Sequence, residues 1–133
     1  MYKFAAIVFA MICTTPAISD VVTDANRMLC ASGPVSHCLE GIGCNSVDPE
    51  DENIPEFIEV DLKRQTLAAT RASGMDRSTS IQHMSQSDGN IYLQGVENGR
   101  LFSLVIAQNS GDLSFTVTAN GETATMFGSC TPD

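Results

Sequence analysis

Apolar and polar residues alternate along the last third of the chain, from Ile91 to Ser129. Three turn-forming dipeptides interrupt this alternation: Asn98-Gly99, Ser110-Gly111 and Asn120-Gly121. An Asn-Gly pair between apolar runs is a strong hairpin signal, because both central residues of a type I′ turn need positive φ. The pattern therefore predicts four antiparallel strands joined by three two-residue turns.

A two-residue turn also fixes which residues face each other across a hairpin. The predicted pairs include Glu97 with Arg100, Leu93 with Leu104, Ile106 with Phe115, and Phe115 with Met126. All three turns, each assigned separately, bring the same residues onto one face, so we expect this face to form the core. Its members are Ile91, Leu93, Gly95, Phe102, Leu104, Ile106, Leu113, Phe115, Val117, Ala119, Ala124, Met126 and Gly128.

Shorter strand candidates precede this meander. Residues 56–63 alternate, with Ile58, Val60 and Leu62 predicted to face inward. A return strand is expected over residues 66–71 and a weaker strand over residues 79–85. The chain is therefore predicted to be all-β, an antiparallel meander of about seven or eight strands that forms a small, disulfide-stapled barrel or sandwich.

The remaining segments lack a clear period. Residues 20–29 read equally as a short helix or as an irregular lead-in to a strand. Residues 30–47 are rich in Gly, Ser and Cys and predict a loop region pinned by disulfides. Residues 48–55 predict an acidic surface loop between two prolines.

The first nineteen residues have the composition of a secretory signal peptide. Lys3 supplies the charged start, an apolar run follows, and Ala17-Ile18-Ser19 supplies a cleavage site. We therefore expect residues 1–19 to be removed, residues 20–133 to form a single β domain, and the mature protein to be periplasmic or secreted.

Four cysteines remain in the mature chain: Cys30, Cys38, Cys44 and Cys130. An even number of cysteines in a short exported chain is typical of a disulfide framework. Three pairings are open. If the first and last strands meet, as in a closed sheet, Cys30 pairs with Cys130 and Cys38 with Cys44, and we prefer this pairing.

The charge of the mature chain restricts its partners. Loss of Lys3 leaves six basic against sixteen acidic residues, a formal charge of −10. Such a charge disfavours nucleic acid and anionic membrane surfaces as partners, and it suits a basic protein partner. The oligomeric state stays open.

Two metal sites can be drawn on the sequence, and both patterns are poor. His37, Cys38, Cys44 and His83 do not have the usual zinc spacing, and the thiols are expected to be oxidised. Asp48, Glu50, Glu52 and Glu59 follow some offsets of a calcium loop, but Asn53 replaces its turn glycine. We therefore predict no metal and no cofactor.

No nucleophile elbow, phosphate-binding loop or zinc-protease motif occurs, so no catalytic residue is assigned and the protein is predicted not to be an enzyme. The face opposite the core includes Tyr92, Leu101, Val105 and Phe127. These residues are either covered by neighbouring loops or form a surface patch that binds a protein.

The spacing Cys30…Cys38…Cys44 and the ending Met126-Phe127-Gly128-Ser129-Cys130 resemble a group of uncharacterised small exported four-cysteine β proteins of Gram-negative bacteria. In size and class the chain is also similar to periplasmic lysozyme inhibitors, although no inhibitory loop motif matches. The first resemblance implies no activity. The sequence thus favours a non-enzymatic protein-binding or inhibitor-like module. The alternatives are a β-barrel that binds a small apolar ligand and, less favoured, an enzyme.

Overall fold

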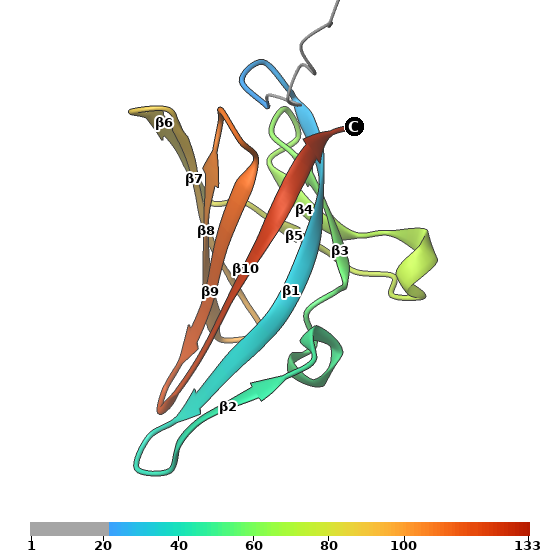
Figure 1. The fold of residues 1–133 in the computed structure, drawn as a ribbon. Helices are drawn as coiled ribbons and strands as arrows, with labels where there is room; N and C mark the ends of the chain where they lie inside the picture. Colours follow the sequence, from blue (N-terminus) through green and yellow to red (C-terminus); the bar gives the residue numbers. More distant parts are fainter. Residues whose placement is uncertain (1–21) are drawn as a thin grey trace, which may run out of the picture.

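The computed structural model describes residues 22–133, so the signal peptide predicted over residues 1–19 lies outside the described part. These residues form one antiparallel sheet, which Figure 1 shows curled into a half-barrel. The strands are β1 (Arg27–Leu39), β2 (Gly43–Val47), β3 (Phe57–Asp61), β4 (Thr66–Ala69), β5 (Ser78–Ser80), β6 (His83–Ser87), β7 (Asn90–Glu97), β8 (Arg100–Ala107), β9 (Asp112–Ala119) and β10 (Glu122–Pro132). Two short 3-10 helices, η1 (Pro49–Glu52) and η2 (Arg71–Ser73), interrupt them. The all-β meander is confirmed, with ten strands instead of seven or eight.

The first and last strands of the described chain lie together in the middle of the sheet. The strand order is β5-β4-β3-β1-β10-β9-β8-β7-β6, with β2 beside β1. One edge of β1 pairs with β10. The opposite edge pairs with β3 through Arg27–Ala31 and with β2 through Val35–Leu39. Cys30 faces Cys130 across β1 and β10, and the two are disulfide-bonded. Cys38 is bonded to Cys44 across β1 and β2.

The prediction of a loop over residues 30–47 is wrong, because this segment contains most of β1 and all of β2. Its alternation is hidden by a bulge between Ser32 and Val35, which shifts the register against β10. Gly33 lies in this bulge, where a Cβ atom would come within 2.5 Å of the backbone oxygen of Phe127. The close approach of two backbones therefore requires glycine where an alternating strand would carry a side chain.

The prediction of one weak strand over residues 79–85 is also wrong, because this segment contributes to two strands on opposite edges of the sheet. β5 pairs with β4, whereas β6 pairs with β7. Between them the Ile81 amide donates to Gln65 and the Gln82 amide to Gln94, both at 2.8 Å. The chain thus crosses from one edge to the other, and Ile81 is buried where it crosses.

The meander β7–β10 has the faces that the sequence predicted. Eleven of the thirteen predicted core residues are buried, and Ala119 and Gly128 are half-buried. The registers across Asn98-Gly99 and Asn120-Gly121 are confirmed, with Leu93 facing Leu104 and Phe115 facing Met126. The second of these turns is not type I′, because only Gly121 of its pair has positive φ.

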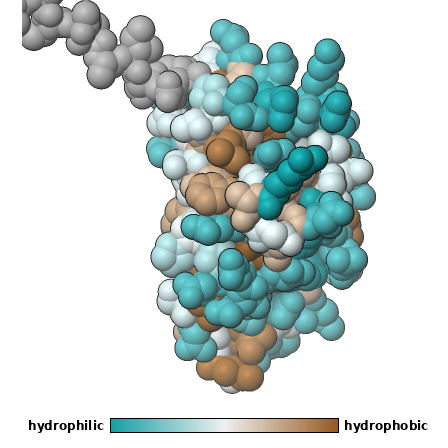
Figure 2. Space-filling model, turned by 90° about the vertical axis from the view of Figure 1, so that its right-hand side faces the viewer, coloured by the Kyte–Doolittle hydropathy of each residue, from teal (hydrophilic) through white to brown (hydrophobic). Residues whose placement is uncertain are grey.

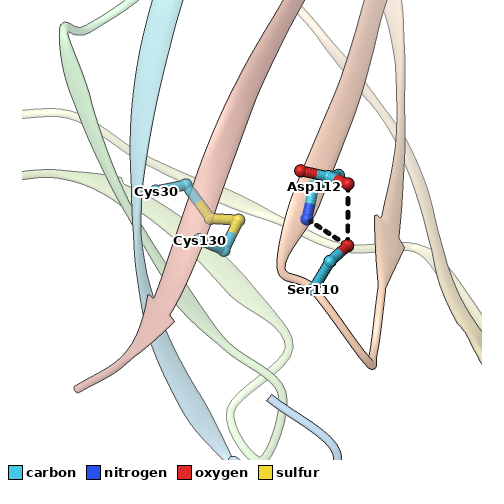
Figure 3. The surroundings of a disulfide bond; sticks show 4 residues. All are labelled: Cys30, Ser110, Asp112 and Cys130. Carbon is cyan, nitrogen blue, oxygen red and sulfur yellow. Dashed lines mark hydrogen bonds between the residues drawn. A yellow bond between two sulfur atoms is a disulfide. The ribbon is translucent and has the colours of Figure 1, made fainter. Parts of the chain in front are cut away.

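The register across Ser110-Gly111 is wrong by two residues. Phe115 faces Leu104, not Ile106, because residues 108–111 form a four-residue loop. Gly111 is held against β10: the Cys130 amide donates to its carbonyl at 2.7 Å, and a Cβ atom on Gly111 would meet the Cys130 oxygen. Figure 3 shows this loop beside the disulfide, with Ser110 hydrogen-bonded to Asp112. A slip of two residues keeps every side chain on its face.

The inner face of the half-barrel has two different ends. At one end β1 begins, β10 ends and the β8–β9 loop lies (top of Figure 1); we call this the sealed end. Buried apolar residues fill it: Val22, Met28, Cys30, Ile91, Ile106, Leu113 and Cys130. The opposite end, with the β7–β8 and β9–β10 turns, we call the pocket end. No helix in the described part is long and apolar enough to cross a membrane.

Candidate functional site

A pocket of about 210 Å³ opens on the inner face at the pocket end. Its walls come from β3, β4, β8, β9 and the segment that follows η1. Six buried apolar side chains line it: Ile54, Ile58, Leu67, Phe102, Phe115 and Val117. Strand alternation points all of these except Ile54 inward, and the curl of the sheet brings β4 opposite β8 and β9. The apolar lining is therefore a direct product of the inner-face pattern.

The pocket is bordered by an ion pair that joins the two edges of the sheet. Arg77, just before β5, pairs with Glu97 at the end of β7. The Arg77 Nε–H donates to Glu97 at 3.0 Å, and a second guanidinium nitrogen donates to the same carboxylate. Arg77 also donates to the carbonyl of Asn53. The hydrogen bond to Glu97 raises the pKa of Arg77 above its ordinary value, against the opposing effect of burial.

A second group of charges lies between η1 and the strands. Arg100 approaches carboxylate oxygens of Glu52 at 3.5 Å and Glu122 at 3.7 Å, and it donates to the Glu52 carbonyl at 3.3 Å. His37 Nδ1 lies 2.8 Å from Glu52, and its Nε2 lies 3.7 Å from Glu122. Arg100 and His37 thus hold η1 against β8, β1 and β10, so that η1 covers one side of the pocket.

Glu52 was predicted to lie in an acidic surface loop, and the structure corrects that prediction. Its side chain is only 12% exposed, and its carboxylate lies 2.8 Å from His37 and 3.5 Å from Arg100. Asp48, Glu50 and Asp51 in the same segment are exposed, as predicted. Because Glu52 is paired with Arg100 and His37, it is also poorly suited to serve as a ligand in the calcium loop considered from the sequence.

The four cysteines and two histidines do not gather into one site. All four cysteines are in disulfides, His37 binds Glu52, and His83 is exposed on the edge strand β6. Within residues 22–133 no group of three or more His, Cys, Asp or Glu side chains is arranged to hold a metal ion.

The four residues of the predicted surface patch lie on the outer face, away from the pocket. Tyr92 faces Val105 across β7 and β8, while Ser114 lies between Val105 and Phe127. Phe127 is 71% exposed, Leu101 47% and Val105 36%, and Tyr92 is half-buried. The structure thus leaves three of these side chains exposed and spreads the four residues over three strands, β7, β8 and β10.

Sequence reasoning missed the charged border of the pocket. The Asn98-Gly99 register did place Glu97 opposite Arg100, and strand parity puts both on the inner face, which was a usable signal. It could not reveal Arg77 or Glu52, because these belong to segments that reach the pocket only through the fold.

Comparison of the chain with protein-family models, curated proteins and solved structures gave no match. The geometry of the pocket and of the surfaces around it therefore carries the functional argument.

Proposed function

We propose that this protein is a non-enzymatic binding protein of an extracytoplasmic compartment, and that its half-barrel holds a small, uncharged, largely apolar ligand. The observation that carries this proposal is the pocket of about 210 Å³ with six apolar side chains in its lining. An engineered apolar cavity of about 150 Å³ is sufficient to bind benzene. The pocket therefore has room for a ligand of one ring with a substituent, or of two small fused rings.

The charges at the pocket favour an uncharged ligand. Two arginines and two glutamates border the pocket, so their formal charges cancel, and each is already paired. A charged ligand would have to break one of these pairs and leave a half-buried charge without its partner, which is unfavourable. A neutral ligand leaves both pairs intact and gains from burial of its apolar surface.

The pocket changes the order of the functions that the sequence favoured. A protein-binding module ranked first when the large inner side chains were expected to fill the interior. They fill the sealed end, but Phe102, Phe115 and Val117 line a space at the pocket end. The pocket lining includes neither His nor Cys, and its two glutamates are each paired with an arginine, which favours binding over nucleophilic or acid–base catalysis. The two disulfides are consistent with an oxidising compartment.

The proposal is tested by titration of the protein with indole, observed through its backbone amide NMR signals. Indole is neutral and fits the estimated size. We expect saturable shifts confined to residues around the pocket, with a dissociation constant in the millimolar range or tighter. Ala69, which lines the pocket opposite Ile58, is replaced in the test variant Ala69→Phe to fill the space. Thr118→Phe on the exposed outer face is the matched control.

Ala69→Phe should abolish the shifts, and Thr118→Phe should leave them unchanged. Retention of the native amide dispersion in Ala69→Phe separates a filled pocket from an unfolded protein. Shifts that are absent in the unmodified protein, or that persist in Ala69→Phe, would overturn the proposal.

A further inference from the structure

The tip of the β1–β2 hairpin exposes apolar side chains that the fold does not use. Ile42 is 77% exposed, the largest value for any large apolar residue in the described chain, and Leu39 is 37% exposed. In Figure 2 brown atoms gather at the lowest point of the molecule, where Figure 1 places this hairpin. None of the tip residues lines the pocket.

The hairpin is held rigidly although it contributes little to the core. All of β2 except Val47 is exposed. The Cys38–Cys44 disulfide lies just before the tip, the Ile42 amide donates to Leu39 at 3.1 Å, and the Glu40 amide donates to Gly121 at 2.9 Å. These restraints fix the direction in which Ile42 projects. A pre-organised apolar side chain loses less entropy on binding than a mobile one.

The exposed charged side chains of the hairpin tip and of η1 are acidic. Glu40 is exposed at the tip, and Glu50 and Asp51 are exposed on η1, which follows β2. The basic groups at this end, Arg100 and His37, already face carboxylates of Glu52 and Glu122. Glu40 therefore puts a negative charge beside Ile42, and Glu50 and Asp51 add negative charge at the far end of β2.

From this combination we propose that the β1–β2 hairpin docks on a basic protein and inserts Ile42 into an apolar cleft rimmed by Lys or Arg side chains. Interface hot spots are anchor residues that fill a pocket on the partner and are surrounded by a polar rim, and Ile42 with Glu40 beside it can serve as such an anchor. An anionic membrane or a second copy of this acidic chain would face the carboxylates with like charge. This docking surface is separate from the ligand pocket and does not depend on it.

The test replaces Ile42 with the photo-reactive residue p-benzoylphenylalanine in the full exported chain, produced in its native host cell. The matched control carries the same residue at position 127, since Phe127 is 71% exposed on the outer face. Irradiation is expected to give one adduct from position 42 that is absent from position 127. Mass spectrometry of the adduct should identify a protein of high isoelectric point.

That protein, once purified, is then titrated with the unmodified chain and with Ile42→Asp at two salt concentrations. Ile42→Asp lies outside the core, so its circular dichroism should match that of the unmodified chain. We expect its affinity to fall at least tenfold, and higher salt to weaken both complexes. No adduct at position 42, the same adduct at both positions, a lipid adduct, a dimer of this chain, or an affinity insensitive to Ile42→Asp would each overturn the proposal.

Discussion

The two ends of the half-barrel are built on the same strands and differ in a few inward-facing residues. At the sealed end β7 and β8 place Ile91 opposite Ile106, and both are buried. At the pocket end the same two strands place Glu97 opposite Arg100 on the same face. Burial of a charged side chain without a partner is unfavourable, and here Glu97 pairs with Arg77 and Arg100 pairs with Glu52. The pocket opens between these two ion pairs.

This difference separates stability from binding within one sheet. The sealed end combines a long-range disulfide with close apolar packing. The pocket end keeps an apolar space that its charged border does not fill. We therefore expect changes at the sealed end to affect the free energy of unfolding most, and changes at the pocket end to affect ligand binding more than stability.

The largest effect should come from removing the disulfide at the sealed end. Cys30 and Cys130 are 100 residues apart, and closing such a loop stabilises by about 4–5 kcal/mol in the chain-entropy model. The double variant Cys30→Ser, Cys130→Ser should lose about this amount in urea unfolding followed by circular dichroism. The Cys38 and Cys44 positions are separated by six residues, and their double variant should lose about 2 kcal/mol. Equal losses would contradict the contrast between the two ends.

A smaller loss is expected from truncation of a large side chain in the wall between the ends. Phe115 is buried and lines the pocket, so Phe115→Ala should cost about 3 kcal/mol, toward the low side of the usual range because one face of the ring already borders a space. Thr116 is its neighbour on the outer face, and Thr116→Ala should cost less than about 1 kcal/mol. Thermal and urea unfolding of both variants measure the difference; similar costs would mean that the faces are misassigned.

The contact between the two sheet edges is expected to tolerate even a methyl group poorly. A Cβ atom on Gly95 would lie 2.4 Å from the Phe102 ring and 2.9 Å from the Ser80 carbonyl oxygen. Gly95→Ala should therefore destabilise by about 1–3 kcal/mol through overpacking. As a control, Val96→Ala changes the exposed neighbour and should cost much less. A neutral Gly95→Ala would show that the edges of the sheet lie further apart.

The smallest effect on stability is expected at the ion pair that borders the pocket. Arg77 and Glu97 are 29% and 20% exposed, so solvent screens the pair, and a double-mutant cycle with Arg77→Met and Glu97→Gln should give a coupling of about 1 kcal/mol or less. Because the folded pKa of Arg77 is raised, its contribution is complete below the unfolded pKa and is lost only as the pH rises through the folded pKa. The coupling should thus be constant across neutral pH. A loss of coupling between neutral pH and mildly alkaline pH would contradict this assignment.

The sequence allowed the faces of the meander to be predicted because strand alternation has a period of two. The two-residue error at Ser110-Gly111 therefore changed the partner of Phe115 but not its side of the sheet. The N-terminal strands were harder, since the bulge at Gly33 breaks the alternation and a single apolar residue, Ile81, marks the crossing between edges. The pocket could not be predicted, because its border joins segments that are distant along the chain.

The central position of β1 has a consequence for synthesis of the chain. Cys30 faces a partner made 100 residues later, so a growing chain carries β1 with one hydrogen-bonding edge vacant until β10 has emerged. Folds dominated by such distant pairings form slowly, and unpaired strands associate readily with other chains. The same arrangement that places both disulfide partners at the middle of the sheet thus makes the newborn protein depend on protection of its first strand.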